Sequence, residues 1–277
     1  NRINDSGMDG TPHLRSNEDD NESTCGTYSA PSGNSVAWVW NAGSSTVSNT
    51  DGTITSSVRA NTTAGFSIVS YTGNSTSGAT VGHGLNATPG MFTIACRNTS
   101  NYWDTWHSGY YVAGTKNYIR MNSSGAAGYS SDMFQTPTSS VVTLGDSSSM
   151  NDGSNTYVMY CWSEVAGYSK FGSWEGNADP DGPYIHLGFR PAVIMTKVTL
   201  GDTGHWWIYD SKRDTYNVLD TTLMANLDNN EAHTTYEMDI LSNGFKIRSS
   251  NININGSGCT FIYAAWAETP FKYSNAR

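Results

Sequence analysis

Short stretches of β-branched and aromatic residues recur along the chain, and clusters of Gly, Asn, Asp or Pro bound each of them. Their length and their apolar and polar positions are typical of β-strands. The clearest predicted strands are residues 35–40, 53–58, 65–71, 91–96, 157–162, 192–198, 244–248 and 260–266. Helical spacing is limited to one candidate short turn near Leu219 to Leu227. We therefore predict an all-β fold, built as an antiparallel β-sandwich or jelly roll.

The chain repeats much of its own sequence. The segment Gly65–Asn74 returns as Tyr168–Asn177, and Asn155–Glu164 returns as Cys259–Glu268. A constant offset of about 103 residues is the signature of a duplicated structural unit. Two tandem related repeats are therefore predicted, either as separate modules or merged into one body. The predicted boundaries are residues 1–64 for an N-terminal segment with a partial repeat, 65–166 for the first repeat and 167–277 for the second.

The N-terminal segment differs from the rest of the chain. Its first 34 residues are polar and include the acidic patch at residues 18–22. The stretch Val36–Trp40 resembles the closing strand of a repeat, because Trp40 aligns with Trp162 and Trp266. We therefore expect the chain to begin partway through an earlier, degenerate copy. Since the first residue is Asn rather than Met, a processed or truncated N-terminus is also expected.

Composition and charge narrow the range of partners. Of 277 residues only 14% are charged, and the net charge is -9. An acidic surface repels phosphate backbones, so we expect no nucleic-acid partner. The chain has no apolar run of membrane-spanning length and no charged-then-apolar leader, so we expect no membrane insertion.

The four cysteines do not indicate a disulfide framework or a metal centre. Cys25, Cys96, Cys161 and Cys259 lack metal-type spacing, and none recurs at its equivalent position in the other copy. A disulfide frame would normally be duplicated along with its module. We therefore expect mostly free, buried thiols.

Two equivalent segments carry the densest groups of aromatic residues, residues 101–107 and 204–210. Sugar C–H groups stack on aromatic faces while the hydroxyls seek carboxylates, amides and histidines, so this composition suits lectin chemistry. Trp103 and Trp206 occupy aligned positions and are expected to line the core side of a strand. Four neighbouring residues, Trp106, His107, Trp207 and Tyr209, are predicted to be exposed contacts. With Asp104 and Asp210, which lie where the two copies differ, they form the candidate glycan-binding set: Asp104, Trp106, His107, Trp207, Tyr209 and Asp210.

No residue pattern predicts catalysis, a metal site or a cofactor. His83 and His186 lack partners at fixed spacing, so a hydrogen-bonded structural role is expected for both. Glu164 and Glu268 are copies of one position rather than the two different carboxyl groups that a glycosidase needs. Turn formation explains the Asp-rich stretch at residues 179–182, and Asp146 with Asp152 also falls short of a complete Ca²⁺ loop.

Several long motifs carry a resemblance to a known family. They are Ala64–Asn74, Ala79–Leu85, Gly167–Asn177, Gly188–Pro191 and Ala267–Arg277. Together these motifs resemble a poorly characterised family of repeat proteins encoded by marine bacteriophages, which occur as tail-fibre or other virion-associated proteins. The resemblance covers residues 35–277. It implies a virion protein without assigned catalytic residues, and a symmetric homo-oligomer with a trimer as the usual fibre arrangement. No binding residue is carried over from it.

Three functional hypotheses follow from these observations. The first is a phage tail-fibre or appendage module, located on the virion with other virion chains, that binds host-surface polysaccharide through several weak contacts. The second is a capsid decoration or tail scaffold protein, which burial of Trp106, Trp207 and Tyr209 would favour. The third is a polysaccharide depolymerase, which needs two non-equivalent carboxylates in one groove. Any specific site is expected where the two copies differ, as at Asp104 and His107 and in the loops after them.

Overall fold

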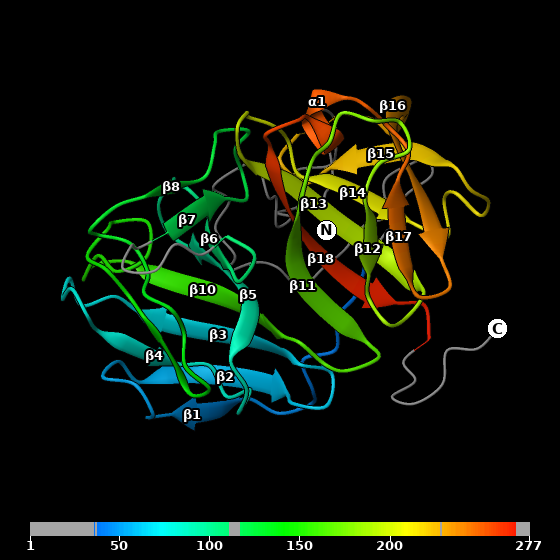
Figure 1. Cartoon of the computed structure of the whole chain (residues 1–277). Coiled ribbons are helices and arrows are strands. Elements are labelled where there is room, and N and C mark those ends of the chain that lie inside the picture. The colour runs from blue at the N-terminus through cyan, green and yellow to red at the C-terminus, as the bar shows by residue number, and fades with distance from the viewer. Residues whose placement is uncertain (1–35, 37, 111–116, 228, 270–277) are drawn as a thin grey trace, which may run out of the picture.

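Two large antiparallel β-sheets make up most of the structure (Figure 1). The structure is a computed structural model that describes residues 36, 38–110, 117–227 and 229–269. In spatial order the first sheet comprises β1 (Val47–Asn49), β2 (Ser56–Asn61), β3 (Phe66–Thr72), β10 (Thr156–Ser163), β5 (Pro89–Cys96), β6 (Asp104–His107), β7 (Asn117–Arg120) and β8 (Gly128–Tyr129). The second comprises β11 (Ser169–Glu175), β18 (Thr260–Ala267), β13 (Pro191–Leu200), β14 (Trp207–Asp210), β15 (Leu219–Met224), β16 (Ala232–Leu241), β17 (Gly244–Ile247) and β12 (Tyr184–His186). The remaining elements are the two-stranded sheet of β4 (Thr80–Gly82) with β9 (Val141–Thr143), and the short helix α1 (Ile252–Asn255).

The same arrangement of strands occurs twice. The order β3-β10-β5-β6-β7-β8 in the first sheet matches β11-β18-β13-β14-β15-β16 in the second, and the pair β4-β9 matches β12-β17. The register agrees as well, because Trp162 lies opposite Met91 in the first sheet and Trp266 lies opposite Val193 in the second. The all-β antiparallel fold predicted from the sequence is confirmed. The duplicated sequence thus corresponds to a duplicated topology, with the hairpin β1-β2 added to the first sheet only.

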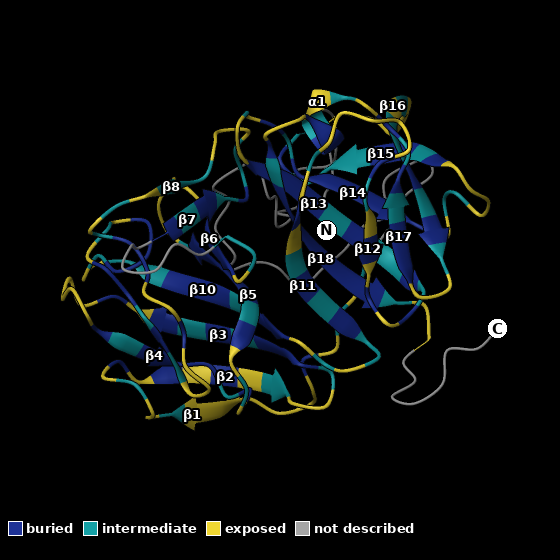
Figure 2. Ribbon diagram, in the orientation of Figure 1, coloured by how far each residue is buried: buried dark blue, intermediate teal, exposed yellow. Residues whose placement is uncertain are grey.

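The central strands are apolar on both faces because both faces are covered. In β10, Tyr157, Met159 and Cys161 point into the core of the first repeat, while Val158 and Trp162 point toward the second repeat. The equivalent strand β18 has the same division. A continuous apolar run is the pattern of a strand buried on both sides. Figure 2 shows these central strands as the most deeply buried part of the molecule.

Each repeat has its own hydrophobic core. In the first repeat the core lies between the large sheet and the pair β4-β9, and includes Val69, Phe92 and Phe134. In the second repeat β16, β17 and β12 extend the sheet around the equivalent core, which includes Ile194, Phe245 and Phe261. These two clusters are named the first and second repeat cores. Both repeats are therefore layered β structures with an apolar interior.

A third apolar layer joins the repeats, and we call it the repeat interface. It is formed by side chains from the outer faces of both large sheets. At one end Phe66 and Trp162 of the first repeat pack with Phe171 and Trp266 of the second, and the rings of Trp162 and Trp266 lie 6.3 Å apart. At the other end Trp103 packs with residues that include Trp206. The two halves seen side by side in Figure 1 thus form one body through a continuous apolar contact.

Two local predictions are wrong. No strand forms over the described residues of the stretch 36–40, although the Trp40 ring packs 5.1 Å from Trp266 and 5.9 Å from Trp162 at the repeat interface. Trp40 therefore contributes packing without strand pairing. The helical turn predicted near Leu219 to Leu227 is instead the strand β15, which pairs with both β14 and β16. Tertiary pairing overrides a weak local preference in this segment.

The cysteine prediction is confirmed for the residues that the structure describes. Cys96, Cys161 and Cys259 are free and buried, whereas Cys25 lies outside the described residues. None of the described helices has the length and apolar character needed to cross a membrane.

Candidate functional site

The six residues predicted as glycan contacts lie on two equivalent strands in the interior. Asp104, Trp106 and His107 belong to β6, and Trp207, Tyr209 and Asp210 belong to β14. All six are buried, so the expectation that Trp106, His107, Trp207 and Tyr209 are exposed is wrong. The physical reason is that β6 and β14 are inner strands of sheets whose two faces are both covered. Trp103 and Trp206 are buried, as predicted, and both pack at the repeat interface.

The aromatic members of this set fill the repeat cores. The Trp106 ring stacks on Phe92 with a centroid distance of 5.8 Å, in the first repeat core. In the second repeat core, the Trp207 ring lies 4.3 Å from Tyr236, and the Tyr209 hydroxyl donates a 2.9 Å hydrogen bond to the Tyr236 carbonyl oxygen. These rings have no free face for a sugar. Their contacts are those of core residues.

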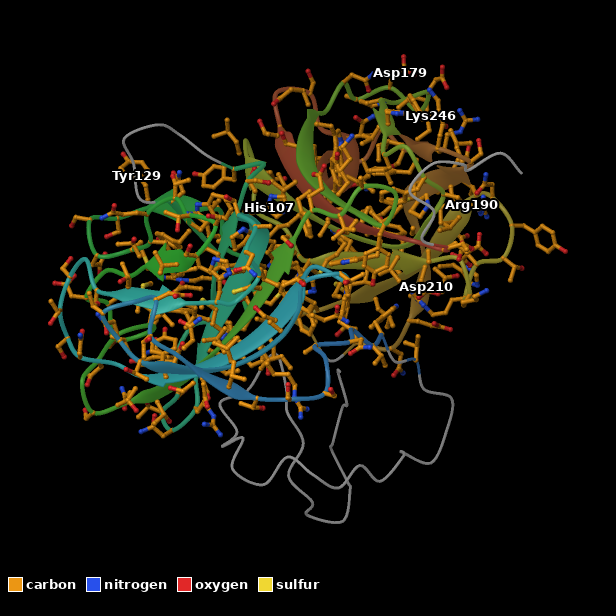
Figure 3. All side chains as sticks on the ribbon, turned by 90° about the horizontal axis from the view of Figure 1, so that it is seen from below. His107, Tyr129, Asp179, Arg190, Asp210 and Lys246 are labelled. Carbon is orange, nitrogen blue, oxygen red and sulfur yellow. The ribbon has the colours of Figure 1, made fainter. Side chains whose placement is uncertain are left out.

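His107 is a polar contact between the repeats. Its Nε2 lies 3.0 Å from the carbonyl oxygen of Tyr263 in β18, and its Nδ1 accepts a 2.9 Å hydrogen bond from the Gly109 amide. Because Nδ1 is an acceptor, Nε2 carries the proton and donates to Tyr263. Burial lowers the pKa of His107 from 6.5 to about 3, so the ring is neutral. Figure 3 shows His107 near the junction of the two halves.

A buried lysine makes a second polar contact across the repeat interface. The Lys197 ammonium group donates a 3.2 Å hydrogen bond to the Ser123 carbonyl oxygen of the first repeat and another to the Gly204 carbonyl oxygen. Burial lowers its pKa from 10.5 to about 8. The Trp206 indole nitrogen also crosses, and donates a 2.8 Å hydrogen bond to the Arg120 carbonyl oxygen. The interface is therefore fixed in register by directional contacts as well as by apolar packing.

Asp210, which occupies the position equivalent to His107, organises a turn within the second repeat. Its carboxylate accepts a 2.7 Å charge-assisted hydrogen bond from Arg213 Nε and further bonds from the Lys212 and Arg213 amides. Arg213 continues to the carbonyl oxygens of Ile208 and Thr221. Figure 3 shows Asp210 in the second half, away from His107. A carboxylate engaged in this way stabilises local structure.

Asp104 has different surroundings from the rest of the set. It lies opposite Arg120 in the pair β6-β7, and Arg120 Nε is 3.6 Å from its Oδ1. Burial raises the pKa of Asp104, while the Ser149 hydroxyl and Arg120 act in the opposite direction and the charge of Asp132 adds to the rise. The Arg120 guanidinium continues outward and stacks 3.6 Å from the ring of Tyr102 and 4.9 Å from that of Tyr118. Asp104 therefore connects the first repeat core to the surface.

The predicted site residues did not include this surface. Tyr102 lies just before β6 in the aligned segment 101–107, whereas Arg120 ends β7 in the region where the two copies diverge. Tyr102 is 47% exposed and the Arg120 side chain 30% exposed. Only the chain topology brings Arg120 next to both Asp104 and Tyr102. The sequence did contain one signal for this surface: Asp104 of the first copy aligns with an apolar residue of the second copy.

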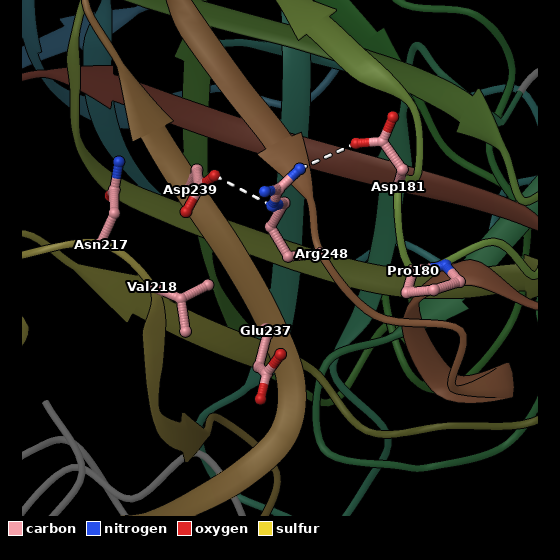
Figure 4. Close-up of a pocket in the computed structure, with 7 residues that line it drawn as sticks. All are labelled: Pro180, Asp181, Asn217, Val218, Glu237, Asp239 and Arg248. Carbon is pink, nitrogen blue, oxygen red and sulfur yellow. Dashed lines mark hydrogen bonds and ion pairs between the residues drawn. The ribbon is translucent and has the colours of Figure 1, made fainter.

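A polar groove opens on the second repeat (Figure 4). Its volume is about 630 Å³, and it is lined by Pro180, Asp181, Asn217, Val218, Glu237, Asp239 and Arg248. Arg248 bridges two of the carboxylates, with contacts of 2.8 Å to Asp181 and 3.1 Å to Asp239. The Asn217 amide is held by the backbone of Ile240 at 2.9 and 3.0 Å. Most polar groups of the groove thus already bind one another.

The remaining sequence candidates have structural contacts. His83 is buried, accepts a 3.3 Å hydrogen bond from the Leu85 amide and contacts the Thr138 carbonyl oxygen, so its predicted structural role is confirmed. His186 ends β12, where its ring lies 3.2 Å from the Tyr184 hydroxyl. Glu268 pairs with Arg190 at 3.1 Å. Among the described residues no group of three or more His, Cys, Asp or Glu side chains is placed to hold a metal ion.

The fold and these contacts define an all-β protein made of two similar repeats, whose two large sheets pack against each other to form one body. The chain belongs to the family described as Domain of unknown function (DUF7483), whose match spans residues 7–270. No curated protein and no solved structure matches the chain.

Proposed function

We propose that this chain is a non-catalytic structural module of a bacteriophage virion, carried on a tail fibre, another appendage or the capsid surface. The phage context comes from the resemblance of its long repeat motifs to virion-associated proteins of marine phages. The structural role is supported by one observation above others. All six residues that would have formed an aromatic glycan site are buried in the repeat cores or at the repeat interface.

The way in which the repeats are joined also supports this role. Two independent lectin modules would be connected by few contacts, whereas these repeats share two apolar clusters and the cross-repeat hydrogen bonds of His107, Lys197 and Trp206. A large apolar contact between domains opposes their relative motion. A rigid body of this kind suits a particle component that must transmit force or hold a fixed spacing.

The proposal is tested by locating the chain in intact particles. Virions of the phage that encodes it are purified on a density gradient, analysed by quantitative mass spectrometry, and labelled with an antibody against residues 38–269 for electron microscopy. We expect several copies per particle at one defined position on the tail or capsid. A chain found only in the soluble lysate, and not in particles, would contradict the proposal.

The assembly state gives a second test. The resemblance implies a homo-oligomer, with a trimer as the usual arrangement of a fibre. Light scattering coupled to size-exclusion chromatography measures the mass of the purified full chain in solution. We expect about three times the mass of one chain, since the resemblance to fibre proteins implies a closed three-fold arrangement. A strictly monomeric chain at high concentration would argue against a fibre and leave decoration of another protein as the structural role.

The groove of the second repeat does not favour a depolymerase. Glycoside hydrolysis uses two carboxyl groups with different roles on either side of the bond. Asp181 and Asp239 are both engaged by Arg248, which leaves Glu237 as the lining carboxylate without an ion pair among the described residues. Incubation of the chain with host polysaccharide, followed by gel filtration of the polysaccharide, is expected to show no shortening.

A further inference from the structure

A charged pair occupies, in the first repeat, a position that is apolar in the second. Asp104 lies opposite Arg120 across β6-β7, and the equivalent cross-strand pair of β14-β15 is Trp207 with Met224. Both repeats nevertheless have the same strand order and register. The fold therefore does not require charge at this position. The charged pair of the first repeat must therefore have a role other than forming the fold.

The charged pair is poorly placed to stabilise the protein. Asp104 is 0% exposed, and neither of its carboxylate oxygens has a hydrogen bond of ordinary geometry to the described residues, although the Ser149 hydroxyl is near enough to lower its pKa. The Arg120 Nε atom forms the ion pair at 3.6 Å, beyond hydrogen-bond distance, and is buried without a hydrogen bond to the described residues. Desolvation of such a pair commonly offsets its attraction, and an apolar pair is often as stable. A polar group retained at a cost in stability is a candidate for a binding role.

The arrangement above this pair offers the groups that recognise a sugar. The Arg120 side chain is 30% exposed and carries guanidinium N–H donors beyond its buried Nε. Tyr102 contacts the guanidinium at 3.6 Å and leaves almost half of its own surface exposed. Hydrogen-bond donors beside an aromatic ring match the hydroxyl groups and C–H faces of a pyranose. The Tyr118 ring also lies near the guanidinium, at 4.9 Å.

We propose that the surface formed by Tyr102 and Arg120 binds a neutral saccharide. Arg120 donates hydrogen bonds to sugar hydroxyls and Tyr102 stacks on the sugar ring, while Asp104 is a positioning residue that orients Arg120. A neutral ligand fits better than an anionic one because Asp104 compensates the charge of Arg120. The net charge of -9 on the chain also repels acidic polymers. This site is separate from the six buried residues and does not depend on the structural role in the virion.

The test compares saccharide binding by the intact chain and by matched variants. The full chain is applied to an array of neutral and acidic oligosaccharides, and the strongest neutral ligand is then titrated calorimetrically at low and high salt. We expect binding to neutral members with little salt dependence, since no net charge is neutralised. Tyr102→Ala and the double variant Asp104→Leu with Arg120→Met are each expected to weaken binding at least about tenfold, by loss of the stacking ring or of the hydrogen-bond donors.

The double variant reproduces the apolar character of the second repeat, so it is expected to fold, and its unfolding curve confirms this. Tyr216→Ala serves as the control, because Tyr216 is an 86% exposed tyrosine of the second repeat. It is expected to bind like the unaltered chain. The proposal is overturned if no neutral saccharide binds, if acidic saccharides bind instead in a salt-sensitive way, or if the variants bind unchanged. None of these outcomes affects the location of the chain in particles, so the two proposals fail separately.

Discussion

Acidification is expected to weaken the repeat interface through His107. The ring is buried between the repeats, donates from Nε2 to the Tyr263 carbonyl oxygen, and has Phe171 packed 6.0 Å away at its side. A second proton on the ring would have to displace the hydrogen bond from the Gly109 amide to Nδ1. The folded protein therefore resists protonation, whereas the unfolded chain accepts a proton freely.

The magnitude follows from the difference between the two pKa values. Burial lowers the folded pKa of His107 to about 3, against about 6.5 for an unfolded histidine. Below pH 6.5 the unfolded state binds more protons, so the free energy of unfolding falls as the pH falls. The loss is about 1.4 kcal/mol for each pH unit in this window, which gives about 2 kcal/mol at pH 5. Stability from this source is complete above pH 6.5.

The assay is urea unfolding at pH 7.5 and pH 5 for the unaltered chain and for His107→Gln. Gln can still donate to the Tyr263 carbonyl oxygen but cannot titrate, so the variant is expected to lose about 2 kcal/mol of the pH dependence. Buried His83, whose pKa is also lowered, contributes equally to both proteins and cancels. The exposed His186→Gln is the control and is expected to keep the full dependence. Equal pH dependence in the unaltered chain and His107→Gln would refute the reasoning.

Three further outcomes are expected. Burial lowers the pKa of Lys197 to about 8, so the folded protein loses this proton at a lower pH than the unfolded chain does. The free energy of unfolding should therefore rise by about 2 kcal/mol from pH 7 to 9.5. Denaturant titration of Lys197→Met should show no such rise, and an unchanged rise would contradict the assignment of this pH dependence to Lys197. Arg120→Met alone leaves Asp104 buried without its ion-pair partner and should lower the free energy of unfolding by about 2 kcal/mol. Adding Asp104→Leu should restore the stability of the protein in the same urea unfolding measurement. A double variant no more stable than Arg120→Met would show that the fold needs the charged pair. Trp266→Ala leaves a cavity at the repeat interface and should lower the free energy of unfolding by about 3 kcal/mol, as measured by calorimetry or urea unfolding. A decrease below about 1 kcal/mol would mean that the interface is not tightly packed.

Sequence reasoning was most reliable where a pattern reports local conformation. The alternating and apolar stretches predicted strands that the structure contains, such as β3, β10 and β18, and the repeated segments predicted the repeated strand order. It was less reliable for weak patterns. The segment near Leu219 has helical spacing over only a few residues, and pairing with β14 and β16 on its two sides makes it a strand.

Exposure was the property that sequence reasoning predicted wrongly. Alternation along β6 and β14 separates two faces, and a single sandwich would leave one of them in water. In this protein one face fills the repeat core with Trp106 or Trp207, and the other packs against the opposite large sheet with Trp103 or Trp206. Nothing in the local pattern shows that a second repeat will cover the remaining face. The buried state of His107 follows from the same cause.

The sequence by itself determined the strands, their duplication and the absence of disulfide-type cysteine spacing, because these depend on side-chain periodicity and on spacing along the chain. Only the tertiary structure decided that the repeats merge through their outer faces, and that Arg120 contacts both buried Asp104 and exposed Tyr102. Both depend on contacts between segments far apart in the sequence. The free energy of those contacts comes from burying apolar surface that distant segments provide together, so no short stretch of sequence reveals it.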